Sequence, residues 1–173
     1  MDVNIVNIGC QNNIYGSSSS QIKGDLTVNA PGSSTVNASN VYGADSSSIG
    51  GIFKMDYCSG ANQNSYVYGL YRSSVDKDVD VHIGKGKYSN IYGVYDYSSS
   101  GCLLKGDTTV VIEDAETSGV IYGLYYATNT SGKCDVTIQN CQTTSYATYY
   151  GMEGSKINGT VAVNMSGNKG YMF

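Results

Sequence analysis

The residues that could carry out catalysis are few and scattered. The 173-residue chain contains one histidine, His82, and one arginine, Arg72. Its acidic residues cluster in the sequence at Glu113, Asp114 and Glu116. Enzymes that cleave polysaccharides need paired carboxylates in one groove. His82 stands at an alternate position of "VDVHI", so we expect it to face solvent rather than to act as a general base. These residues predict no catalytic site.

Three aspartates raise the question of a bound cation. Asp78, Asp107 and Asp135 each come just before or within similar apolar segments, so we expect them to lie at the same place in successive repeats. Carboxylates stacked that closely repel one another unless the turns stagger or a cation lies between them. An Asp side chain that bonds local backbone N–H groups is the favoured interpretation. The calcium-binding pattern G-G-x-G-x-D is absent, and the sequence predicts no metal and no cofactor.

The cysteines show no metal-ligand spacing. There are five, with no C-x-x-C pair and no histidine partner at the spacing of a zinc site. They are Cys10, Cys58, Cys102, Cys134 and Cys141. We expect small buried thiols, with one or two disulfides as the alternative.

Tyrosine dominates the rest of the chain and reveals a repeat. Seventeen tyrosines occur, and phrases such as "NIYGVY", "VIYGLY" and "YVYGLY" recur. The tyrosine of the Tyr-Gly pair returns every 24 to 30 residues. Its six positions are Tyr15, Tyr42, Tyr68, Tyr92, Tyr122 and Tyr150. Self-similarity at such a period indicates a repeat architecture.

A second segment of each repeat alternates apolar and polar residues, as a strand does. It includes "GDLTV", "DVDVHI", "GDTTVVI", "CDVTI" and "GTVAV". The alternation predicts that Val79, Val81, Ile83, Val136, Ile138, Val161 and Val163 point inward. Each repeat therefore contains two predictable strands, with room for a short third one near "STVNAS" or "AETSGV".

The repeat predicts an all-β chain built as a parallel β-helix, or β-solenoid, of about six coils of 24 to 30 residues. No window has the i, i+3, i+4 pattern of a helix, and a propeller blade needs roughly 40 or more residues. Residues 1–173 form one such domain, or a segment of a longer array. In this fold the six Tyr-Gly tyrosines stack as a ladder that serves packing.

A second set of tyrosines lies three residues further on. Tyr71, Tyr95 and Tyr125 form a shorter ladder, with Tyr97 and Tyr126 beside it. A row of exposed tyrosines suits sugar rings or a partner protein, so these five are the predicted binding residues.

The segment "GDTTVVIEDAETSGVIYGLYYATNTSGKCDVTI" resembles the Tyr-Gly-containing repeats of large adhesin-like surface proteins of bacteria. The likeness covers nearly the whole chain as periodicity, although this chain has Gly-Val, Gly-Leu, Gly-Ala or Gly-Met where that family commonly has Gly-Gly. The resemblance implies an extracellular, right-handed β-helix on the cell surface, and it assigns no catalytic residue.

Together these features predict a non-enzymatic adhesive or structural repeat protein that presents a tyrosine-rich surface to a glycan or host surface. A polysaccharide-binding or polysaccharide-cleaving β-helix is the alternative, and ice binding, suggested by single recurring threonines such as Thr109 and Thr137, is a weaker one. The net charge of −4 and the scattered basic residues disfavour nucleic acid. No apolar run approaches the ~18 residues of a membrane span.

The two ends of the chain look uncapped. Residues 2–16 repeat residues 78–93, and the last strand, "TVAVNM", is as apolar as the internal ones. Uncovered end coils expose apolar side chains and unpaired backbone groups. We therefore expect head-to-tail stacking of copies into filaments, or a chain that is an internal segment of a longer rod.

Overall fold

The computed structural model is an all-β solenoid of about six turns with roughly 27 residues each. It describes residues 1–6, 8–9, 12–30, 32, 36–59, 63–98, 101–143 and 147–173, and only the backbone of residues 8 and 63–65. No helix occurs among the described residues. The fold class predicted from the repeat is confirmed.

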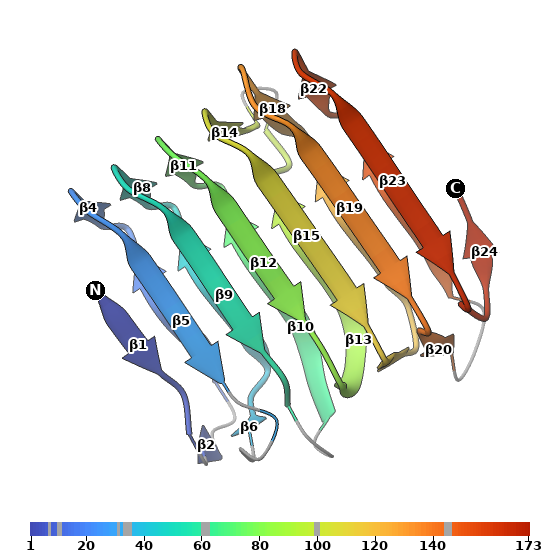
Figure 1. The fold of residues 1–173 in the computed structure, drawn as a ribbon. Coiled ribbons are helices and arrows are strands. Elements are labelled where there is room, and N and C mark those ends of the chain that lie inside the picture. Colours follow the sequence, from blue (N-terminus) through green and yellow to red (C-terminus); the bar gives the residue numbers. More distant parts are fainter. Residues whose placement is uncertain are drawn as a thin grey trace.

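Three parallel sheets run along the solenoid, and each turn visits them in the same order (Figure 1). The first sheet contains β1 (Asp2–Asn4), β5 (Leu26–Ala30), β9 (Phe53–Tyr57), β12 (Val79–Ile83), β15 (Thr108–Glu113), β19 (Cys134–Gln139) and β23 (Val161–Ser166). The second contains β3 (Ile14–Ser18), β7 (Asn40–Asp45), β10 (Gln63–Tyr71), β13 (Gly86–Tyr95), β17 (Val120–Tyr125), β21 (Thr148–Glu153) and β24 (Tyr171–Met172).

The third sheet is made of very short strands. They are β4 (Gln21–Ile22), β8 (Ser48–Ile49), β11 (Ser74–Val75), β14 (Cys102–Leu104), β18 (Ala127–Asn129) and β22 (Lys156–Ile157). Two small pairings complete the structure: β2 (Ile8–Gly9) pairs with β6 (Val36–Asn37), and β16 (Ala115–Thr117) lies between the start of β13 and β20 (Gln142–Thr143).

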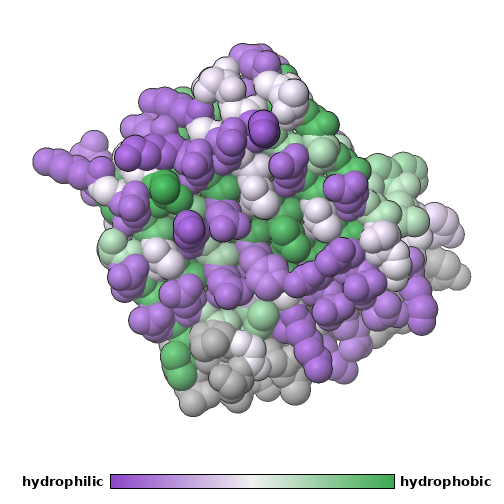
Figure 2. All heavy atoms as spheres, viewed as in Figure 1, coloured by the Kyte–Doolittle hydropathy of each residue, from purple (hydrophilic) through white to green (hydrophobic). Residues whose placement is uncertain are grey.

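The coil is right-handed. In Figure 1 the strands of the first sheet lie in front and run downward, the other sheets return behind them, and successive turns advance from left to right. A right-handed coil agrees with the strong preference for right-handed crossover connections between parallel strands. The view of the same side in Figure 2 shows a mostly hydrophilic face over the first sheet, with hydrophobic residues reaching the surface at the right, near the C-terminus.

The core follows the predicted alternation of the first sheet. Val79, Val81 and Ile83 are at most 1% exposed, and Val136 and Ile138 are fully buried. Each inward side chain packs against its equivalent in the turns above and below, since the register pairs Val81 with Val110 and Val110 with Val136.

The last turn differs from the internal turns. Val161 and Val163 keep the inward register of β19, but their side chains are 48% and 40% exposed. The physical reason is position: no described turn lies beyond β23, so one side of these valines has no packing partner. The predicted inward direction is correct, and the exposure agrees with the expectation that an uncovered end coil exposes apolar side chains.

The glycine of each Tyr-Gly pair is buried and lies directly against side chains of the first sheet. At Gly93 an added Cβ would collide with Val110 and come within 2.6 Å of the Gly123 carbonyl oxygen. The other five glycines of the pair meet equivalent obstacles, namely Gly16, Gly43, Gly69, Gly123 and Gly151. None of them adopts a positive φ, so the glycine is required by packing and not by a turn conformation.

The turns into the first sheet use aspartates as caps. Asp25 Oδ1 accepts from Ile52 N at 2.8 Å, Asp78 Oδ1 from Asp107 N at 3.0 Å, and Asp107 Oδ1 from Lys133 N at 2.8 Å. Asp78 and Asp107 therefore bond backbone N–H groups at these turns, as expected, but those groups belong to the next turn of the solenoid and not to the local backbone. Asp135 does not share their position: it pairs with Thr109 inside the strand, so the expected row of three stacked carboxylates was wrong.

Candidate functional site

The six Tyr-Gly tyrosines form one continuous stack on the outer face of the second sheet. Successive ring centroids lie 4.8, 4.8, 4.9, 5.6 and 4.6 Å apart, and the rings tilt by 8° or less from parallel. The stack runs through Tyr15, Tyr42, Tyr68, Tyr92, Tyr122 and Tyr150. Phe173 extends it by a seventh ring, 5.4 Å from Tyr150 and tilted by 21°. The predicted ladder did not include Phe173, which is a phenylalanine at the position where the other turns have a tyrosine.

The second ladder lies against the edge of the first. Tyr71 and Tyr95 stack at 5.5 Å, and Tyr95 and Tyr125 at 5.0 Å. Each also makes an edge-to-face contact with the first ladder, such as Tyr92 with Tyr95 at 4.6 Å and 65°. Pairs of this geometry contribute about 0.5 to 1.5 kcal/mol each beyond area burial.

This packing limits what the ladders offer a ligand. Within each ladder the ring faces are covered by neighbouring rings, so a sugar ring has no free face to stack on at Tyr95. The outward surface consists of ring edges and phenolic hydroxyls, which donate and accept hydrogen bonds. The five predicted binding residues therefore divide into three packed tyrosines and two more exposed ones.

The exposed pair is Tyr97 and Tyr126. Tyr97 is 60% exposed and lies 6.3 Å from Tyr71 in a tilted contact. The Arg72 guanidinium lies over the Tyr97 ring, 5.2 Å from its centroid. Tyr126 is 40% exposed, has a φ of 52° and packs edge-on against Tyr125 at 4.8 Å.

Burial in the ladders suppresses ionisation of the phenols. Desolvation, followed by the electrostatic effect of neighbouring groups, chiefly other tyrosines, raises the pKa of Tyr42 to about 12 and that of Tyr92 to about 12. The same causes raise the pKa of Tyr68 further. The phenols of Tyr42, Tyr68 and Tyr92 therefore stay protonated to a higher pH than ordinary tyrosines, and their hydroxyls can donate hydrogen bonds.

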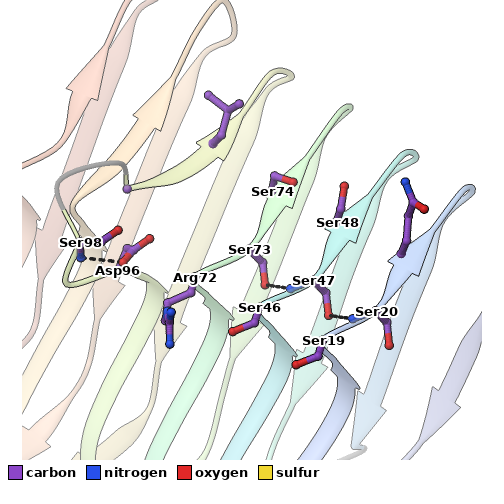
Figure 3. A pocket seen from close by; sticks show the side chains of 13 residues that line it. Ser19, Ser20, Ser46, Ser47, Ser48, Arg72, Ser73, Ser74, Asp96 and Ser98 are labelled. Carbon is purple, nitrogen blue, oxygen red and sulfur yellow. Dashed lines mark hydrogen bonds between the residues drawn. The ribbon is translucent and has the colours of Figure 1, made fainter.

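A polar groove lies beside the tyrosines, at the corner where the second sheet passes into the third (Figure 3). Its volume is about 490 Å³. Its walls are almost entirely polar and come from three successive turns and from the loop after β13. They are Ser19, Ser20, Gln21, Ser46, Ser47, Ser48, Arg72, Ser73, Ser74, Asp96, Ser98, Gly101 and Leu103.

The floor of the groove is fixed by serine hydroxyls. Ser47 N donates to Ser73 Oγ at 3.1 Å, and Ser20 N donates to Ser47 Oγ at 3.3 Å. The Ser47 hydroxyl also bonds the Ser17 hydroxyl at 2.6 Å, inside the core. The serine hydroxyls thus take the place of backbone carbonyl groups as acceptors for the N–H groups at this corner. The corner is tight, because the residues just before these serines, Ser19, Ser46 and Arg72, all have φ near 50°.

His82 belongs to a different surface, the outer face of the first sheet. Its Nδ1 lies 2.9 Å from Asp56 Oδ1 and its Nε2 3.0 Å from Glu113 Oε1. Gln139 Nε2 donates to Glu113 Oε2 at 2.6 Å, and this bond, with that to His82, lowers the Glu113 pKa. The arrangement is a hydrogen-bonded row of side chains on the outer face of the sheet.

The described cysteines carry free thiols. Cys102, Cys134 and Cys141 are fully buried and Cys58 is partly buried, while Cys10 lies outside the described residues. Burial raises the pKa of Cys134 and Cys141 to about 11. Within the described ranges, no group of three or more His, Cys, Asp or Glu side chains is placed to hold a metal ion.

The groove and the third sheet were missed at the sequence level. Their strands are two or three residues long, too short to show an alternation. The signal that could have found them is positional: "SSSSQI", "DSSSI" and "RSSV" each follow a Tyr-Gly strand at the same distance. Aligned on the tyrosine, these segments place serines in adjacent turns.

A comparison with protein-family models, with curated proteins and with solved structures found no match to this chain. The class is defined by the structure itself: a right-handed β-solenoid with a tyrosine-rich outer face. Among the described residues there is no helix long and apolar enough to cross a membrane.

Proposed function

We propose that this chain is a non-enzymatic adhesive or structural repeat protein of the cell surface or extracellular space, which presents its tyrosine face to a partner. The observation that carries the proposal is the continuous stack of the six Tyr-Gly tyrosines, which the second ladder flanks over three successive turns. The resemblance of the repeats to those of adhesin-like bacterial surface proteins points the same way.

The chemistry of the face suits a broad, hydroxyl-rich partner. Phenolic edges of Tyr71, Tyr95 and Tyr125 recur at the strand spacing and present one hydroxyl per turn. Glycan hydroxyls and the backbone groups of a matrix protein both complement such a row. Because the rings are already packed, they lose little conformational entropy on binding.

A glycan and matrix-protein array tests this function with a variant that keeps the rings. Replacing Tyr71, Tyr95 and Tyr125 together by Phe preserves stacking but removes the hydroxyls, so we expect at least about a tenfold loss of binding, as three hydrogen bonds of ~0.5 to 1.5 kcal/mol imply. Tyr171→Phe, at a tyrosine outside both ladders, is the matched control. An array without any bound partner, or a triple variant that binds like the wild type, contradicts the proposal. Release of reducing sugar from a polysaccharide would indicate the enzymatic alternative instead.

The C-terminal turn supports a second role, end-to-end association of copies. Val161 and Val163 form an apolar, inward-facing row that is 48% and 40% exposed, and Phe173, 67% exposed, has no described ring on the face away from Tyr150. The register of the first sheet places Met1 at the position that Val161 occupies in the last turn.

Continuing this register into a second copy gives matched neighbours. Val3 of the second copy falls opposite Val163, its Ile5 opposite Met165, and its Tyr15 on Phe173. Tyr15 is 41% exposed at the other end of the ladder. Two of the three sheets continue across such a junction, which makes a head-to-tail contact that does not close on itself.

A further inference from the structure

The groove at the corner of the second and third sheets contains polar groups that the fold does not use. The inner serines, Ser47 and Ser73, hold the corner through backbone bonds. The next residue in each of these turns, Ser48 and Ser74, points outward, and the two are neighbours in the paired strands β8 and β11. Their side-chain hydroxyls make no hydrogen bond to any described residue. Donors and acceptors therefore line the groove at the strand spacing.

Arg72 stands at the edge of this groove as the only arginine of the chain. Its positive φ of 53° is shared by Ser46 and Ser19 at the same corner, so this backbone conformation is a repeated feature of the solenoid. The arginine side chain, by contrast, occurs in this turn alone. Its guanidinium rests on the Tyr97 ring and forms no ion pair or hydrogen bond with any described residue, which leaves a planar set of N–H donors facing solvent.

Asp96 supplies the opposite charge in a buried position. The residue is only 4% exposed, and it lines the groove (Figure 3). Its Oδ1 accepts a hydrogen bond from Ser98 N at 2.7 Å. No other described residue donates a hydrogen bond to this carboxylate. A carboxylate this deeply buried normally has several donors, and its second oxygen has none among the described residues, so it is available as an acceptor for a ligand.

We propose that this groove binds a saccharide that carries an anionic group, with the anion on Arg72 and sugar hydroxyls on Asp96, Ser48 and Ser74. Arginine binds carboxylates and sulfates through paired N–H donors, and these charge-assisted bonds are the strong ones. A sugar hydroxyl donates to the Asp96 carboxylate in a bond of the same kind. Tyr97 holds the guanidinium in place through a cation–π contact.

The two charges together favour a saccharide over a simple anion. Phosphate or sulfate alone would be attracted by Arg72 but repelled by Asp96 and could not satisfy it with a donor. A polyhydroxylated ligand can meet both groups because it has hydroxyls as well as an anion. The groove adjoins the ladders through Tyr97, but the site binds through Arg72 and Asp96 and not through the phenolic hydroxyls of the second ladder, so separate variants test the two proposals.

Calorimetric titration of the whole chain with defined oligosaccharides tests the site. The probes are a galacturonate hexasaccharide, its fully methyl-esterified form, a sulfated glycosaminoglycan hexasaccharide and inorganic phosphate. The variants are Arg72→Gln and Asp96→Asn, and the matched control is Lys54→Gln, which removes one positive charge from the exposed outer face of the first sheet.

We expect the wild type to bind an acidic hexasaccharide, and Arg72→Gln and methyl esterification each to weaken binding about tenfold or more. Asp96→Asn should lower the affinity for the esterified and for the acidic hexasaccharide by similar factors, whereas Lys54→Gln should change neither affinity. Preference for the carboxylated or the sulfated probe identifies the anionic group. Equal binding of ester and acid, unchanged affinity in Arg72→Gln, competition by phosphate at the same concentration, or no binding of either acidic probe would each overturn the proposal.

Discussion

At the residue scale, the glycine after each tyrosine shows how far the sequence could be read. The recurrence of Tyr-Gly predicted a ladder of rings, because repeats in a solenoid must stack in register. It did not give the reason for the glycine. The structure does: Gly93 and Val94 both face the interior, and the glycine has no room for a Cβ against Val110. Contact between two sheets is not visible in a local sequence pattern.

Gly93→Ala therefore tests the packing explanation. The added methyl group would collide with Val110 and approach the Gly123 carbonyl oxygen, so we expect the free energy of unfolding to fall by ~1 to 3 kcal/mol. Chemical denaturation measures this change. Gly24→Ala is the matched control, because an added Cβ there meets nothing within 4 Å. A second variant, Val110→Ala in the Gly93→Ala background, should recover part of the loss; equal stability of Gly93→Ala and Gly24→Ala would rule the explanation out.

The raised pKa values of the ladder tyrosines predict a loss of stability in alkali. The folded pKa of Tyr42 and Tyr92 is about 12, against 10.0 for an ordinary tyrosine. Above pH 10 the unfolded chain releases these protons before the folded one does, so the unfolded state gains free energy of ionisation. The stabilising contribution is complete below pH 10 and is lost as the pH rises toward 12.

Denaturation at a series of pH values from 9 to 12 measures this loss, and absorbance at 295 nm follows phenolate formation. Tyr42→Phe should show a shallower decline than the wild type, since one titrating group is removed. Because buried thiols act in the same direction from about pH 9, a variant with Cys134 and Cys141 replaced by Ala is the control. A midpoint that stays constant over this pH range contradicts the prediction.

At the element scale, long strands were predictable and short ones were not. β15 and β19 have the strict alternation of a half-buried strand, and their inward valines give the register directly. "AETSGV" was expected to allow a third strand, and β16 forms there. The third sheet was missed because two-residue strands such as β8 are fixed by their neighbours in adjacent turns. Their pairing is a tertiary property, and so is the groove that depends on it.

The register of β19 can be tested with one inward and one outward position. Val136→Asp should abolish folding, because the side chain is fully buried and an unpaired charge there has no partner. Thr137→Asp, at the next residue, points to the outer face and should cost less than about 1 kcal/mol. Circular dichroism and denaturation of both variants measure the difference. Equal losses at the two positions would mean that the register of this strand is wrong.

At the scale of the whole molecule, stability is distributed from turn to turn. Each turn of a solenoid contacts only its neighbours, so internal turns are stabilised on two sides and end turns on one. The exposed fraction of the inward valines shows this difference between internal and end turns. Val136 is fully buried, whereas Val163, one turn further, is 40% exposed. A substitution at the end should therefore disturb association more than folding.

Blocking the two ends separately tests head-to-tail association of copies. Val163→Asp places a charge on the exposed C-terminal row, and Val3→Asp places one on the half-buried N-terminal row that would cover it. We expect the wild type to form species that grow with concentration, as light scattering and electron microscopy can show, and each variant alone to remain monomeric.

An equimolar mixture of the two should form dimers and nothing larger, because the free C-terminal end of Val3→Asp can bind the free N-terminal end of Val163→Asp and the complex then has two blocked ends. Asn164→Asp, on the outward side of the same strand, controls for added charge and should associate like the wild type. A wild type that stays monomeric at high concentration, or a mixture that contains only monomers, would show that the exposed turn does not bind the opposite end of another copy.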